Sequence, residues 1–96
     1  MRRADLDGYY ALMESFLSGL MSAEAFEASY LAMFKADNRA FPDSIFRVLN
    51  QLFSDVDMFV SDPEIREPTD LDETQLLERT RQAHAELEKV MRMKSG

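Results

Sequence analysis

The chain has 96 residues, of which 46% are hydrophobic and 30% charged, and its formal net charge is −7 at pH 7. This length predicts a single domain over residues 1–96, and the apolar content excludes a disordered acidic tail. The absence of cysteine excludes a disulfide framework and a thiolate metal site, and no stretch approaches the ~20 apolar residues of a membrane span. We therefore expect a soluble protein, with the cytoplasm as its default location.

Two amphipathic helices are predicted in the first third of the chain. Apolar residues recur at three- and four-residue steps from about Leu6 to Leu20, and Gly19 can adopt the left-handed turn that ends a helix. Ser22 then suits the N-cap of a second helix, from Ala23 to Ala36, because its hydroxyl can accept a hydrogen bond from the first turn. The short connection makes these helices antiparallel neighbours.

A third helix is predicted to start at Pro42 or Asp43 and to run to about Val60, where the Asp62-Pro63 pair ends it. Its apolar residues are too dense for a helix with one buried side. They are typical of a central helix around which the others pack.

The remaining chain is predicted to form a loop and one long helix. Residues 64–70 form an extended connection, and Asp72 with Gln75 three positions later resembles a capping box. An apolar stripe then continues to Met91. No stretch shows the alternation of a half-buried strand, so the expected fold is all-α, a small antiparallel bundle of four or five helices.

The charge is concentrated in one stretch, from Ser54 to Glu73. The stretch has a local balance of −7, whereas the residues before and after it carry −2 and +2. One surface, rather than a generally acidic body, is therefore expected to carry the charge. Its eight acids, opposed by Arg66 alone, are Asp55, Asp57, Asp62, Glu64, Glu67, Asp70, Asp72 and Glu73.

The sequence offers little to catalysis or to cofactor binding. His84 is the sole histidine and lies on the apolar stripe of the last helix. We expect its side chain to be hydrogen-bonded at the edge of the core. The three glycines form no phosphate-binding loop, and the acidic stretch lacks the glycine and terminal glutamate of a calcium-binding loop. We expect no enzyme, no metal, no cofactor and, given the sign of the charge, no direct nucleic-acid binding.

Two interpretations of the acidic stretch stay open on charge alone. Such runs usually form a solvated face, and Asp72 has a ready role as a helix cap. The concentration of the whole net charge beside Met58 and Ile65 favours instead a surface that pairs with a basic partner.

Three stretches in order resemble a known family: YYALMESFLSGLMSAEAFEASYLAMFK, FPDSIFRVLNQLFSDVDMFVSDPEIREP and DLDETQLLERTRQAHAEL. They are similar to the small bacterial self-protective immunity proteins like that of colicin D, and LFSDVDMFVSDPEIR is the most specific part. The resemblance implies a helical bundle that binds the C-terminal toxic domain of a colicin or of a contact-dependent inhibition toxin, commonly a tRNA-cleaving nuclease. An acidic surface would then fill the basic substrate cleft.

The resemblance carries the family's acidic positions onto Asp57 and Asp62, with Glu64 next. Charge and apolarity alone add five residues to the predicted partner-binding set: Asp55, Met58, Ile65, Glu67 and Asp70.

Two other classes of protein remain open from the sequence. A different acidic interaction module, an adaptor or nucleic-acid mimic, would carry the same surface, whereas an enzyme would need a pair of buried carboxylates with raised pKa values. Whether the protein is an immunity protein or another acidic interaction module, we expect a monomer.

Overall fold

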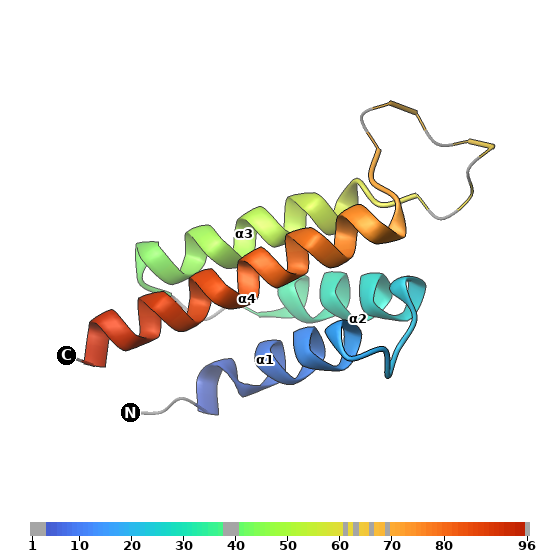
Figure 1. The fold of residues 1–96 in the computed structure, drawn as a ribbon. Coiled ribbons are helices and arrows are strands. Elements are labelled where there is room, and N and C mark those ends of the chain that lie inside the picture. Colours follow the sequence, from blue (N-terminus) through green and yellow to red (C-terminus); the bar gives the residue numbers. More distant parts are fainter. Residues whose placement is uncertain are drawn as a thin grey trace.

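A computed structural model describes residues 4–37, 41–60, 62, 64–65, 67–68 and 70–95. Within these ranges the chain forms four helices, and an all-α fold is confirmed (Figure 1). The helices are α1 (Ala4–Leu17), α2 (Ala23–Ala36), α3 (Asp43–Asp57) and α4 (Glu73–Ser95). No helix in the described part of the chain has the length and apolar character needed to cross a lipid bilayer.

Local capping interactions set the helix ends that the sequence predicts. The hydroxyl of Ser22 accepts a hydrogen bond from the Ala25 N–H at 3.1 Å, at the start of α2. Before α4, the Asp72 carboxylate accepts from the Gln75 N–H at 2.8 Å while the Gln75 side chain accepts from the Asp72 N–H at 3.0 Å. This reciprocal pair is a capping box, and it fixes the point where the chain re-enters the bundle.

Gly19 ends the first helical segment in the expected way. Its φ angle is +84°, its N–H donates to the Phe16 carbonyl at 3.1 Å, and the Leu20 N–H donates to the Ser15 carbonyl at 2.8 Å. This pattern is the Schellman motif, which requires a left-handed residue that glycine adopts without strain.

The third helix ends earlier than the sequence predicts, at Asp57 rather than near Val60. The Leu71 N–H donates to the Met58 carbonyl at 2.9 Å, and the Val60 N–H donates to the Leu71 carbonyl at 3.0 Å, so this backbone pairs across the loop instead of continuing the helix. Phe59 and Leu71 form an isolated parallel bridge there. The predicted stop at Pro63 lies outside the described residues.

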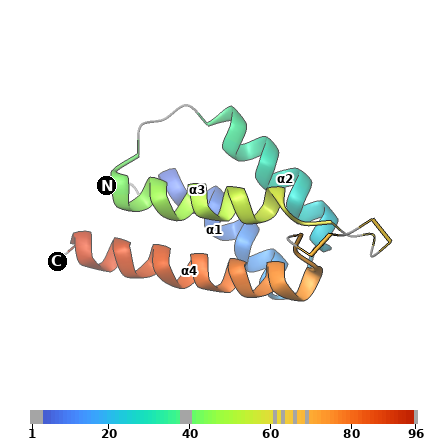
Figure 2. The same cartoon turned by 90° about the horizontal axis from the view of Figure 1, so that it is seen from above.

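The helices form a ring in which each packs mainly against two neighbours. The pairs in contact are α1–α2, α2–α3, α3–α4 and α4–α1, so that α2 and α4 lie on a diagonal. Both views show the α1–α2 turn and the α3–α4 loop at the same end of the bundle (Figures 1 and 2). The prediction that α3 is a central helix with more than one buried side does not hold. It packs between α2 and α4, but Phe46, Arg47, Asn50 and Ser54 leave one side of it exposed.

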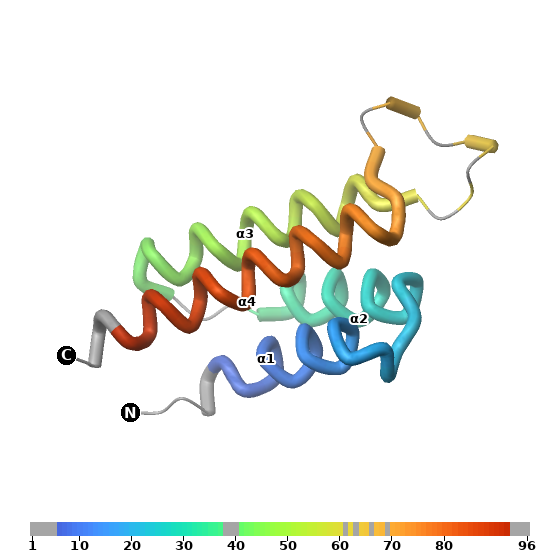
Figure 3. The backbone as a smooth tube through the Cα atoms, in the orientation of Figure 1, coloured from blue at the N-terminus to red at the C-terminus, as the bar shows by residue number. Residues whose placement is uncertain are grey.

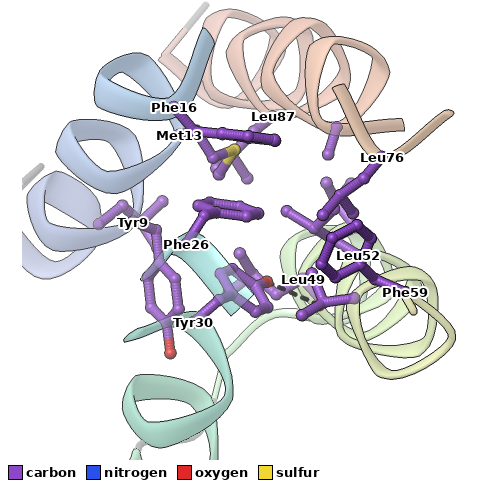
Figure 4. Close-up of a cluster of buried hydrophobic side chains, with 14 of the residues drawn as sticks. Tyr9, Met13, Phe16, Phe26, Tyr30, Leu49, Leu52, Phe59, Leu76 and Leu87 are labelled. Atoms are coloured by element: carbon purple, nitrogen blue, oxygen red, sulfur yellow. Dashed lines mark hydrogen bonds between the residues drawn. The ribbon is translucent and has the colours of Figure 1, made fainter. Parts of the chain in front are cut away.

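All four helices contribute side chains to one core (Figure 4). Phe16 of α1 stacks on Phe26 of α2 with ring centroids 4.5 Å apart. The buried Tyr30 hydroxyl donates to the Leu49 carbonyl at 2.8 Å, which ties α2 to α3, and burial raises the pKa of this phenol well above its ordinary value. Fully buried side chains include Tyr9, Met13, Phe26, Tyr30, Leu49, Leu52, Leu76 and Leu87.

Replacement of Leu52 by alanine should lower the free energy of unfolding by about 2–5 kcal/mol, because a fully buried leucine leaves a cavity at the junction of the helices. Chemical denaturation followed by circular dichroism measures the loss. Gln82→Ala, at an exposed position of α4, is the control and should stay within about 0.5 kcal/mol of the parent protein. A loss at Leu52 as small as that of the control would contradict the core assignment.

Candidate partner-binding surface

Most of the acidic stretch lies in the loop between α3 and α4, whose described parts project beyond the ends of the helices (Figure 3), while Ser54 to Asp57 form the last turn of α3. The two backbone hydrogen bonds between Met58, Val60 and Leu71 close the base of this loop. Phe59 and Leu71 are both buried at this point. The loop is therefore anchored to the core by its two ends and carries its remaining residues outward.

Two carboxylates also organise the loop backbone. Asp62 Oδ1 accepts from the Glu64 N–H at 3.0 Å, and Asp70 Oδ2 accepts from the Glu67 N–H at 2.9 Å. A carboxylate has about four lone-pair sites, so one backbone bond leaves most of its capacity to accept from a partner. These turns hold the acids in place without neutralising them.

Most of the predicted contact residues are exposed at this end of the molecule. Among the apolar ones, Ile65 is 68% and Met58 39% exposed. Asp70 is half-buried beneath the loop. The exposed acids in this part of the predicted set are Asp57, Asp62, Glu64 and Glu67.

Asp55, in contrast, is buried, with only 6% of its surface exposed. Arg79 of α4 donates to Asp55 Oδ1 at 2.8 Å, and the Gln51 amide donates to the same atom at 3.3 Å. This carboxylate links α3 to α4 and has a cation of its own. Charge alone placed Asp55 on the predicted partner surface, and this buried position does not agree with that prediction. Helical periodicity turns Asp55 toward α4 and Asp57 toward solvent.

The tertiary structure adds two acids of α2 that the sequence analysis did not include. Burial raises the pKa of Glu27, and the charges of Glu24 and Asp57 raise it further. Glu27 in the first turns of α2 therefore lies within electrostatic reach of Glu24 and of Asp57 in the last turn of α3. The predicted antiparallel order of the helices could have placed Glu24 and Glu27 beside Asp57. In such a bundle the start of the second helix and the end of the third lie at the same end.

A further apolar side chain lies in the turn at this end. Leu20 is 82% exposed in the α1–α2 turn, although the corresponding position of a Schellman motif often packs back on the helix. The acidic loop, the start of α2 and this turn thus share one end of the bundle, which we call the acidic end. It is defined by Leu20, Glu24, Glu27, Asp57, Met58, Asp62, Glu64, Ile65 and Glu67.

His84 lies away from the acidic end and has structural contacts. Its Nε2 is 3.0 Å from Glu14 Oε2 of α1, its Nδ1 is 3.9 Å from Glu88, and its ring meets Tyr10 edge-on at 5.5 Å. These contacts agree with the expected position at the edge of the core. Across the described ranges, no group of three or more His, Cys, Asp or Glu side chains is arranged to hold a metal ion.

A small helical protein with exposed carboxylates and apolar side chains gathered at one end has the features of a protein that binds another protein. The chain belongs to the bacterial self-protective colicin-like immunity family, whose model matches residues 5–87. Its class is therefore that of a toxin-neutralising immunity protein, and the family implies an inhibitor rather than an enzyme.

The match covers all of α1, α2 and α3 except the first residue of α1, together with the acidic loop and most of α4. No curated protein and no solved structure matches the chain.

Replacement of Asp55 by alanine should destabilise the fold, whereas the same change at Asp57 should not. The first change removes the acceptor of Arg79 and Gln51 and is expected to cost about 1–3 kcal/mol; the second should stay within about 0.5 kcal/mol. Urea denaturation of the two variants makes the comparison. Equal losses of unfolding free energy in the two variants would contradict the different structural roles assigned to Asp55 and Asp57.

Replacement of Glu27 by glutamine should stabilise the fold at neutral pH. The pKa of Glu27 is higher in the folded than in the unfolded chain, so its ionised form opposes folding once the pH exceeds the folded pKa. The advantage of the variant should shrink as the pH falls through this pKa and vanish well below 4.5, where both states hold the proton. Thermal melts at several pH values test this, with Glu86→Gln on α4 as the control.

Proposed function

We propose that the protein binds the nuclease domain of a cognate bacterial toxin and blocks its basic substrate cleft with the acidic end. The toxin is a tRNA-cleaving enzyme of the colicin or contact-dependent inhibition type. The exposed carboxylates of Asp57 at the end of α3 and of Asp62, Glu64 and Glu67 in the loop after it are the observation that supports this mechanism. Membership of the immunity family supports the choice of a toxin as partner.

The proposed chemistry is mimicry of a phosphate backbone. A nuclease that holds RNA needs lysine and arginine side chains in its cleft, and carboxylates can accept the same charge-assisted hydrogen bonds as phosphate oxygens. A folded domain is too wide to pass through the cleft as RNA does. Once seated, it prevents entry of substrate without itself being cleaved.

Charge also favours rapid capture of the toxin. The acids of the loop and the net charge of −7 produce a field of one sign that would steer a basic domain to the acidic end. Fast association matters to an immunity protein, because tRNA in the cytoplasm is exposed to every toxin molecule that is still free. We place its action in that compartment.

Met58 and Ile65 supply the apolar part of the proposed contact. They interrupt the acids at the base and at the tip of the loop, and their exposure has no structural use in the isolated protein. Apolar contacts at the centre of a charged surface exclude water and strengthen the surrounding ion pairs.

Reversal of charge at Asp57 and Asp62 should abolish protection. The double variant Asp57→Lys with Asp62→Lys places cations against the basic cleft, so cells expressing it should not survive the toxin encoded beside the gene. Affinity measured by isothermal titration calorimetry should fall by at least about a hundredfold, and the remaining affinity should depend less on salt.

The control variant carries Glu78→Lys and Glu86→Lys, two exposed positions of α4 that change the net charge by the same amount. It should retain protection and affinity. Equal loss in both variants would show that net charge alone matters, and full protection by the first would place the interface elsewhere. Cleavage of tRNA by the isolated toxin domain, with and without the protein, tests the proposed nuclease class.

A further inference from the structure

A stripe of aromatic side chains lies on the outer side of the α2–α3 pair. The Phe34 ring of α2 lies 5.0 Å from the Phe53 ring and 6.1 Å from the Phe46 ring of α3, measured between centroids. Phe46 is 46% exposed, and the other two are half-buried. The three rings therefore form one partly exposed apolar ridge across the two helices.

Helical periodicity places acids at one end of this ridge. Glu27 precedes Phe34 by seven residues on α2, and Asp57 follows Phe53 by four on α3, so each acid lies on the same helix face as its phenylalanine. The start of α2 and the end of α3 lie at the acidic end of the bundle (Figures 1 and 2), and the charge of Asp57 contributes to the raised pKa of Glu27. We call the whole stripe the α2–α3 face: Glu27, Phe34, Phe46, Phe53 and Asp57.

The bundle uses this face only in part: Phe34 and Phe53 pack against the edge of the core, whereas Phe46 is left exposed. The fully buried Tyr30 and Leu49 join α2 to α3 beneath this face, and the Phe34 ring stacks on the Tyr30 ring with centroids 6.1 Å apart. α2 is inclined to α3, and the two helices diverge away from the acidic end (Figure 2). Phe46 contacts the Phe34 ring on one side and leaves 46% of its surface exposed, so it extends the partly exposed Phe34 and Phe53 into one apolar patch.

We propose that the α2–α3 face is a second docking surface for the same toxin domain. It holds a basic amphipathic segment of that domain at the edge of the blocked cleft, next to Asp57. This inference rests on the proposed function and extends its contact surface from the loop onto the helices. The charge at one end of the face identifies the partner, because cationic side chains with apolar stems fit both parts of it.

The dimensions suit such a segment. Eleven residues separate Phe46 from Asp57, which corresponds to about 16 Å along a helix. A segment of that length can place aliphatic side chains on Phe34 and Phe46 and direct a lysine or arginine to Glu27 and Asp57. An arginine over the exposed Phe46 ring would add a cation–π contact. A second copy of this chain is a poorer occupant, because it carries the same strong negative charge.

The test uses the full chain and the isolated toxin domain. Phe46→Ala should weaken binding by about tenfold or more, the usual effect of removing an aromatic contact, while thermal denaturation shows a folded protein. Gln82→Ala, on α4 diagonal to α2, is the control and should bind as the parent does. A photoreactive benzoylphenylalanine at position 46, which keeps an aromatic ring there, should cross-link to the toxin domain, whereas the same group at position 82 should not.

The outcomes separate the two proposals. In the first outcome, the parent protein binds the toxin domain, the Asp57→Lys, Asp62→Lys variant does not, and position 46 neither cross-links nor affects affinity. The α2–α3 face is then not a docking surface, and the loop alone carries the function. If the parent protein fails to bind the toxin domain, the proposed function is wrong and this extension is wrong with it.

Discussion

The acidic end depends on one short piece of backbone pairing, between Met58 and Leu71. It stops α3 at Asp57, buries Phe59 and Leu71, and so fixes both ends of the loop to the core. A free loop of this length would lose entropy on binding, and an interface that is already held avoids part of that cost. The capping box at Asp72 then returns the chain to the bundle, so the carboxylates project from a rigid base.

The same stretch of sequence holds one acid that stabilises the fold and, two residues later, one that we propose for binding. Asp55 faces α4 and has Arg79 as its partner, whereas Asp57 faces outward beside Glu27. Burial of Glu27 and the nearby charge of Asp57 disfavour the ionised form of Glu27, and a basic partner would relieve that cost. Burial of the first acid is compatible with the fold only because Arg79 and Gln51 satisfy it. Adjacent charges of one sign therefore have different roles, which are set by the direction in which the helix turns them.

Most of the fold could be predicted because the signals are local. Ser22, Gly19, Asp72 and Gln75 act on backbone groups within a few residues of themselves, and the ends of α2 agree with the sequence pattern. The end of α3 was mispredicted because the competing backbone partner, Leu71, lies far along the chain. The acidic loop could likewise be found from composition, but the contributions of Glu24, Glu27 and Leu20 to the same end could not, since they are distant in sequence.

By itself, the sequence determined the helical class, the caps and the concentration of charge in one stretch, because periodicity, capping and composition depend on neighbouring residues. The resemblance of that stretch and its flanks to immunity proteins also came from the sequence, and the family match over residues 5–87 confirmed it. Only the tertiary structure decided which acids are free, as its packing pairs Asp55 with Arg79 and leaves Asp57 exposed. It also brought Phe34 to Phe46 and Phe53, because the contact of two helix faces depends on how the whole bundle assembles.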